Sequence, residues 1–285
     1  MVFILLKSIL LISLLIGDTS HQTSPFTNTE LVSFYSPSRD QEITFVIFTP
    51  PGYDKSEQRY PVLYFLHGRS GNHFLYWGAI SHSVPDADGD AGAWISRMIQ
   101  EGIIPPMIIV TPDDADGMWG EINETMITRE LVEYVDSHWR TIPGRTGRAI
   151  EGFSMGGMGA SRYAARHPDL YCSTIIMAAP GVEPLIEDWE NNRAAILEND
   201  LKVRLVVGSE DDQLEPMTGL HEDLNLLEIL HDFVVVPGVG HDLGMLYNAV
   251  GVPGLQFHGA CFRNLPPTET HHSFLPGIIR HYVPY

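Results

Sequence analysis

The residues with the clearest chemical potential are the five at positions 152–156, which read Gly-Phe-Ser-Met-Gly. A serine hydroxyl is a poor nucleophile at neutral pH, so an enzyme must expose it, deprotonate it and stabilise the oxyanion that it creates. Glycines on both sides of Ser154 allow the sharp strand-to-helix turn that projects a hydroxyl from the edge of a sheet. An apolar run precedes the pentapeptide and small residues follow it. This context predicts that Ser154 is a nucleophile.

A nucleophilic serine needs a base, and the chain offers 13 histidines. His241 follows the apolar run 233–236 in the flexible loop Pro-Gly-Val-Gly-His. There it could take the proton from Ser154 and return it to a leaving alcohol. A loop histidine bonded to backbone is the alternative interpretation. We expect His67, which precedes a glycine, to orient its own loop by hydrogen bonding.

An imidazole base also needs an acid that holds its tautomer and stabilises its cation. Three consecutive carboxylates follow the apolar run 203–207, and Asp211 is favoured over Asp212 and Glu210. The two carboxylates that do not act as this acid would be charged side chains of the loop. The order of serine, aspartate and histidine along the chain is the one expected of an α/β hydrolase.

The oxyanion would need two backbone N–H donors. One is expected from Met155, the residue after the nucleophile, at the positive end of its helix. The second is expected from Arg69, in the loop after the apolar run 61–66. A plain turn at His67 and Gly68 is the alternative.

Tryptophans and acidic loops are the other candidates for binding. Trp119 stands in a Gly-rich loop, so we expect it to line the substrate cleft, because flat apolar faces suit aromatic acyl groups and sugar rings. The acidic stretch 86–90, together with Asp113, Asp114 and Asp116, invites a calcium site, but residues 86–97 do not follow the EF-hand pattern. We expect solvated loops there and assign no metal ligand.

The elements that must position these residues alternate along the chain. Several apolar runs are continuous rather than alternating, as a parallel sheet covered on both faces requires. We predict an α/β-hydrolase fold with a mostly parallel central sheet of about eight strands and helices on both faces. The candidate residues follow the strands, so they should meet at the carboxyl edge of the sheet. Strands are expected near 31–35, 43–49, 61–66, 106–111, 148–153, 173–178, 203–207 and 233–236, and helices near 93–100, 125–140, 155–166, 186–199 and 217–230.

Composition limits the partners and the compartment. The 285 residues carry a formal charge of −19, which argues against nucleic-acid and membrane-surface partners. Residues 1–20 contain a short apolar run and are predicted to be a secretory signal peptide, with an uncleaved anchor as the alternative. We expect one α/β-hydrolase domain over 25–264, a C-terminal tail over 265–285, and a secreted or periplasmic protein without stable membrane association.

Cys172 and Cys261 are the two cysteines of the chain. A secreted protein could pair them in a single disulfide. Two separate buried thiols are the interpretation that we favour.

Four stretches of the chain, including the region around Ser154, together match the pattern of a known family. Together with 148–160, the segments 60–68, 167–171 and 238–242 resemble the "putative esterase" (esterase D-like) family of α/β hydrolases. This family contains feruloyl esterases, S-formylglutathione hydrolases, enterochelin esterases and mycolyl transferases. The resemblance covers roughly residues 30–262, and the acidic stretches and the tail depart from it. It implies a triad of Ser154, Asp211 and His241, with oxyanion donors on Met155 and Arg69.

The resulting expectation is a carboxylic ester hydrolase that forms an acyl-serine and needs no cofactor. Its substrate would be a small-molecule or polysaccharide-linked ester. An acyltransferase with the same triad, moving an acyl group to a sugar or lipid alcohol, is one alternative. A non-catalytic binding module on a hydrolase scaffold is the other.

Overall fold

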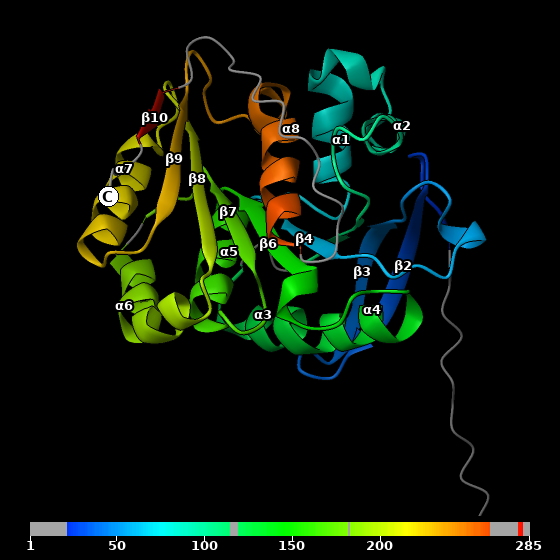
Figure 1. The fold of residues 1–285 in the computed structure, drawn as a ribbon, viewed down its shortest axis with the longest axis horizontal. Helices are drawn as coiled ribbons and strands as arrows, with labels where there is room; N and C mark the ends of the chain where they lie inside the picture. The colour runs from blue at the N-terminus through cyan, green and yellow to red at the C-terminus, as the bar shows by residue number, and fades with distance from the viewer. Residues whose placement is uncertain (1–21, 115–118, 182, 263–278, 282–285) are drawn as a thin grey trace, which may run out of the picture.

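A twisted ten-stranded sheet forms the centre of the molecule (Figure 1). The computed structural model describes residues 22–114, 119–181, 183–262 and 279–281. The strand order is β1-β2-β3-β5-β4-β6-β7-β8-β9-β10. The six strands from β5 to β9 in this order are parallel, and the others pair antiparallel. Their bounds are β1 (Gln22–Thr23), β2 (Thr29–Ser36), β3 (Gln41–Phe48), β4 (Val62–Leu66), β5 (Ile108–Pro112), β6 (Arg148–Phe153), β7 (Ser173–Met177), β8 (Lys202–Gly208), β9 (His231–Val236) and β10 (Ile279–His281).

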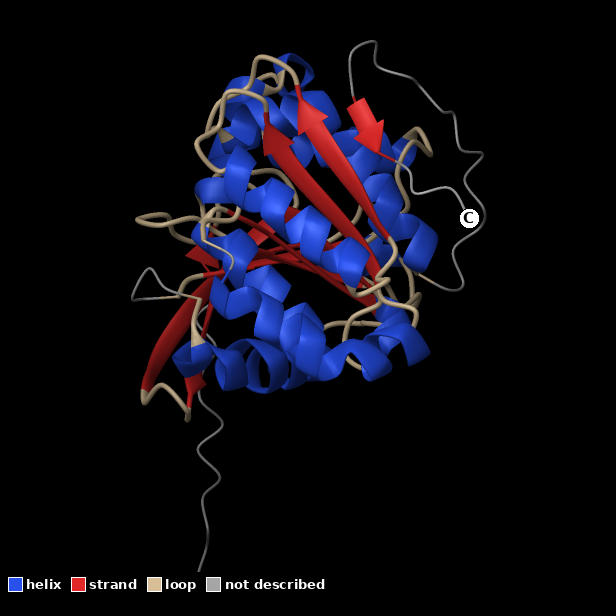
Figure 2. Cartoon of the chain, turned by 90° about the vertical axis from the view of Figure 1, so that its left-hand side faces the viewer, coloured by secondary structure: helices blue, strands red, loops and turns tan. Residues whose placement is uncertain are grey.

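Helices cover both faces of this sheet (Figure 2). Helices α1 and α8 pack against each other on one face, with α2 beside α1, and α5 and α6 pack together on the other (Figure 1). A continuous helical segment over 121–138 joins the second group and contains a π-helical stretch. The helices are α1 (Leu75–Ser83), α2 (Ala91–Gln100), α3 (Glu121–Thr125), the π-helical η3 (Met126–Leu131), α4 (Val132–His138), α5 (Met155–Arg166), α6 (Glu183–Glu198), α7 (Leu214–Leu226) and α8 (Leu243–Cys261), with short 3₁₀ turns at Tyr53–Lys55, Pro85–Ala87 and Arg145–Gly147.

The predicted fold class is confirmed. All residues of β4, β5, β6 and β7 are buried, which explains why their sequences do not alternate between apolar and polar residues, although β6 and β7 also bury a few polar side chains. The eight strands from β2 to β9 match the predicted runs, and β1 and β10 add short antiparallel edges. Helices α1 and α8 are absent from the sequence-based prediction. Helix α8 contains Pro253 and several glycines, which disfavour a helix in a propensity argument.

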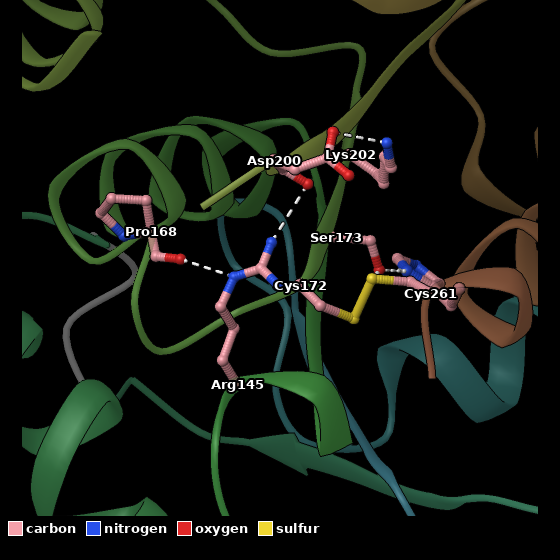
Figure 3. Close-up of a disulfide and its surroundings, with 8 residues drawn as sticks. Arg145, Pro168, Cys172, Ser173, Asp200, Lys202 and Cys261 are labelled. Atoms are coloured by element: carbon pink, nitrogen blue, oxygen red, sulfur yellow. Dashed lines mark hydrogen bonds and ion pairs between the residues drawn. A yellow bond between two sulfur atoms is a disulfide. The ribbon is translucent and has the colours of Figure 1, made fainter. Parts of the chain in front are cut away.

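The two cysteines form a disulfide, so the expectation of two separate thiols was wrong (Figure 3). Cys172 immediately precedes β7 and Cys261 ends α8, and their Cα atoms lie 6.0 Å apart. The pairing depends on α8 running back across the sheet to the start of β7. Spacing along the chain carries no information about that return.

The predicted signal peptide, residues 1–20, lies outside the described residues. Most of the predicted tail also lies outside them, but residues 279–281 form β10 beside β9. In the described part of the chain, no helix combines the length and the apolar character that a membrane crossing requires.

Candidate active site

Ser154 occupies a strained turn between β6 and α5. Its backbone has φ 57° and ψ −120°, a conformation that costs a non-glycine residue about 1–3 kcal/mol. The Ser154 N–H donates to the carbonyl of Met177 on β7 at 2.8 Å. The flanking glycines are required sterically: a Cβ on Gly152 would lie 2.1 Å from the Gly156 carbonyl, and one on Gly156 would lie 1.9 Å from the Leu66 carbonyl. The turn is therefore held by close backbone packing against the strands beside it.

The imidazole of His241 lies between Ser154 and Asp211. Its Nε2 is 2.9 Å from the Ser154 Oγ. Its Nδ1 is 3.0 and 2.9 Å from the two carboxylate oxygens of Asp211. A carboxylate accepts only, so Nδ1 carries the proton and Nε2 is left to accept from the serine hydroxyl. The Asp211 side chain has no exposed surface, whereas that of His241 is 38% exposed.

A contact between the loops after β8 and β9 holds Asp211 beside His241. The Glu210 N–H donates to the Val239 carbonyl at 2.9 Å, which ties the loop after β8 to the loop after β9. Gly208 allows the approach, because a Cβ there would lie 1.9 Å from the same carbonyl. Of the three candidate acids, Asp211 is buried beside His241, and Glu210 and Asp212 are exposed. The Gln213 N–H also donates to Asp211 Oδ1 at 2.8 Å and orients the carboxylate.

The two expected oxyanion donors lie on elements beside the serine. Met155 begins α5, where the first N–H groups of a helix have no partner within it. The loop after β4 passes close to Ser154, because a Cβ on Gly68 would lie 3.3 Å from the Ser154 Cβ. Arg69 follows in this loop and is exposed. The roles of Met155 and Arg69 remain predictions.

The chain is similar in sequence to known proteins. Residues 36–228 match the family described as "putative esterase". The chain belongs to this family. It is 32% identical over 157 residues to an endo-1,4-β-xylanase/feruloyl esterase of Xylanibacter ruminicola, an alignment that covers 50% of this chain and 20% of that protein. It is 29% identical over 167 residues to an esterase of Mycobacterium tuberculosis, covering 53% of this chain and 33% of that protein. The chain thus spans a third or less of the length of these curated relatives.

Solved structures show that the fold is that of α/β-hydrolase esterases. A ferulic acid esterase superposes with a TM-score of 0.70 at 23% identity, over 84% of this chain and 100% of that one. A serine-to-alanine mutant of the feruloyl esterase module from Clostridium thermocellum, complexed with sinapinate, has a TM-score of 0.68 at 19% identity, over 86% of this chain and 91% of that one. An S-formylglutathione hydrolase from Staphylococcus aureus has a TM-score of 0.62 at 16% identity, over 85% and 96% of the two chains.

The prediction that Trp119 lines a substrate cleft was wrong. Its side chain is completely buried, and its indole N–H donates to the His67 carbonyl at 2.7 Å. Its ring also meets the His67 ring at a centroid distance of 5.1 Å. Gly159 on α5 leaves the space for it, because a Cβ there would lie 2.4 Å from the Trp119 Cβ. Trp119 therefore lies in the protein interior and supports the loop after β4 through its contacts with His67.

The residues of the acidic stretches lie in three different environments. Asp86 and Asp88 are exposed, as expected of solvated loop charges. Asp90 caps α2 by accepting from the Ala93 N–H. Asp114 departs from the expectation, because it is only 1% exposed and lies near the buried His67.

A buried polar cluster beneath the turn was missed by the sequence analysis. Glu151, three residues before the nucleophile, is 1% exposed and accepts from the phenol of Tyr247. His258 links Glu151, at 3.3 Å, to the Ser173 hydroxyl, at 2.8 Å. Burial, and then the charge of Glu151, raise the pKa of Tyr247 well above its ordinary value, so the phenol stays protonated as a donor. A carboxylate inside the otherwise apolar run 149–153 is the sequence signal that could have revealed it.

Proposed function

We propose that this protein is a carboxylic ester hydrolase that acts through an acyl-serine intermediate on Ser154. The observation that carries the proposal is the continuous hydrogen-bonded line from the Ser154 hydroxyl through His241 to the buried Asp211. Membership of the "putative esterase" family supports the same reaction class.

In the first half of the proposed reaction, Ser154 Oγ attacks the ester carbonyl carbon while His241 Nε2 takes the hydroxyl proton. Asp211 holds the imidazole in the tautomer that can accept this proton and stabilises the imidazolium that forms. The N–H groups of Met155 and Arg69 donate to the tetrahedral oxyanion. His241 then gives its proton to the alcohol oxygen, the carbon–oxygen bond of the ester breaks, and the acyl group remains on Ser154.

In the second half, water replaces the alcohol. His241 takes a proton from the water as its oxygen attacks the acyl carbon, and the same N–H groups hold the second oxyanion. The proton returns to Ser154 Oγ as the acyl–serine bond breaks, which releases the carboxylic acid and restores the free serine. No cofactor enters these steps.

We infer that the acyl group is a hydroxycinnamate and that the alcohol belongs to a small molecule or a polysaccharide. The support comes from the relatives, one of which is named an endo-1,4-β-xylanase/feruloyl esterase and another of which is solved with sinapinate. A panel of methyl ferulate, methyl sinapinate, acetyl and long-chain esters tests this inference. We expect the highest kcat/KM for the hydroxycinnamates, and equal or greater values for acetyl or long-chain esters would contradict it.

We also propose secretion or export, with residues 1–20 as the signal peptide. The Cys172–Cys261 disulfide supports this proposal, because such bonds persist in oxidising compartments. Edman sequencing of the exported protein would find a new N-terminus between residues 17 and 24, and an N-terminus that retains the apolar run would contradict the proposal.

The central experiment replaces Ser154 by alanine. We expect Ser154→Ala to lower kcat for short p-nitrophenyl esters by at least about 10⁴-fold, because the nucleophile is lost. A fluorophosphonate probe should label the native chain and fail to label this variant. Ser137→Ala, on the exposed surface of α4, is the matched control and should keep both properties.

Two outcomes would contradict the proposed function. Unlabelled native protein without turnover would indicate a binding module on a hydrolase scaffold. Labelled protein that passes its acyl group mainly to an added alcohol, rather than to water, would indicate an acyltransferase. Circular dichroism of each variant shows that loss of activity is not loss of folding.

A further inference from the structure

Three side chains of the types that bind metal ions lie close together at the ends of β4 and β5. They are His67, Asp113 and Asp114, and one nitrogen or oxygen atom of each lies within 4.8 Å of those of the other two. His67 Nε2 is 3.8 Å from Asp113 Oδ1 and 3.7 Å from Asp114 Oδ1. The His67 and Asp114 side chains are each 2% exposed, and that of Asp113 is 27% exposed. The three residues are other than Ser154, His241 and Asp211, the residues of the proposed reaction.

The hydrogen bond made by His67 determines which of its ring nitrogens carries the proton. Its Nδ1 lies 2.8 Å from the carbonyl oxygen of Gly68, which can only accept, so Nδ1 carries a proton. In the neutral ring, Nε2 then presents a bare lone pair. This atom is buried and has no hydrogen-bond partner among the described residues. It lies 3.8 and 3.7 Å from two carboxylate oxygens, which are also acceptors, so a cation between these atoms would satisfy the unpartnered nitrogen.

The hydrogen bonds around the cluster are those expected around a metal-binding histidine. A ligating imidazole almost always donates its other N–H to a carbonyl or carboxylate, and His67 does so to Gly68. One ligating carboxylate is also fixed from outside, because His73 Nδ1 lies 3.0 Å from Asp113 Oδ2. Bonds of about 2.0–2.2 Å from a cation to nitrogen and oxygen span separations up to about 4.3 Å, so both His67 distances are within reach.

We propose that His67, Asp113 and Asp114 bind one divalent cation of borderline hardness, such as Zn²⁺. One imidazole and two carboxylates suit such an ion better than Ca²⁺, which takes an all-oxygen shell. The cation cancels the two negative charges and takes the His67 lone pair. Since His67 bonds to Gly68, and Trp119 to the His67 carbonyl, the ion fixes the loop that carries Arg69. Its role is structural, and it takes no part in the proposed proton transfers.

The test measures metal binding directly on the full chain, purified without a polyhistidine tag and stripped with EDTA. We expect isothermal titration calorimetry to find one high-affinity Zn²⁺ per chain and weaker binding of Ca²⁺. Asp114→Asn should weaken Zn²⁺ binding by about 10-fold or more. Asp88→Asn, an equal change at an exposed acidic position, is the matched control and should bind as the native chain does.

Two further measurements keep the test decisive. If Asp114→Asn fails to fold, Asp113→Asn replaces it, and Co²⁺ added to the native chain should give visible absorption bands that Zn²⁺ removes.

The pair of His221 and His231 is an alternative binding site for Zn²⁺, because His221 Nδ1 and His231 Nε2 lie 2.7 Å apart. The variant His221→Gln tests this alternative. Tighter binding of Ca²⁺, no binding to the native chain, or binding that His221→Gln abolishes and Asp114→Asn leaves intact would overturn the proposal.

Discussion

At the scale of single residues, the proposed chemistry depends on how differently two neighbouring carboxylates are placed. Asp211 is buried, contacts both His241 Nδ1 and the Gln213 N–H, and has no exposed side-chain surface. Asp212, the next residue, is exposed. A buried carboxylate interacts with a nearby imidazolium through a lower effective dielectric than an exposed one, so its contribution is larger.

This difference gives a matched pair of variants. Asp211→Asn should lower kcat for p-nitrophenyl esters by about 10⁴-fold, because an amide does not hold the imidazole in the productive tautomer or stabilise its cation. Asp212→Asn should keep kcat within a few-fold of the native value. Steady-state kinetics of both variants check the assignment, and a larger loss in Asp212→Asn would move the triad acid to that position.

At the scale of elements, the turn between β6 and α5 works because backbones approach more closely than side chains permit. Gly156, in the first turn of α5, meets the carbonyl of Leu66 at the end of β4. This contact joins the element that carries the serine to the element that leads into Arg69. Helix position alone does not require glycine there, since its φ is not positive.

Two glycine-to-alanine variants separate close packing from helix propensity. Gly156→Ala should lower the free energy of unfolding by about 1–3 kcal/mol or more, because its Cβ would lie 1.9 Å from the Leu66 carbonyl. Gly78→Ala on α1 meets nothing within 4 Å and should raise it by about 0.4–1 kcal/mol. Guanidinium unfolding measures both, and equal effects would show that packing at the turn is looser than described.

At the scale of the whole molecule, the disulfide joins segments that lie far apart in the chain. It connects the start of β7 to the end of α8 across 89 residues (Figure 3). Closing a loop of this length restricts the unfolded chain strongly, which raises the free energy of the unfolded state relative to the folded one.

Removal of this bond should therefore destabilise the fold. The double variant Cys172→Ser, Cys261→Ser is expected to lower the free energy of unfolding by about 2–4 kcal/mol. Dithiothreitol should lower the stability of the native chain and leave that of the double variant unchanged. Denaturant unfolding with and without reductant measures this. A native chain whose stability ignores reductant would contradict the prediction.

The sequence by itself determined the order of the strands β2 to β9 and of most helices, without α1 and α8, and it predicted the turn at Ser154. Continuous apolar runs specify buried parallel strands, and a serine between glycines after such a run specifies the turn, because both patterns are local. The rule that sites form at the carboxyl edge of a parallel sheet then placed His241 and the three acidic candidates near Ser154.

The tertiary structure alone decided the features that depend on contact between distant segments. It buried Asp211 and exposed Asp212, buried Trp119 behind the loop after β4, and brought Cys172 to Cys261. It also brought His67 to Asp113 and Asp114. Asp211 and Asp212 have the same side chain and differ in the direction in which it points. That direction is set by packing between distant segments, and composition and spacing do not specify it.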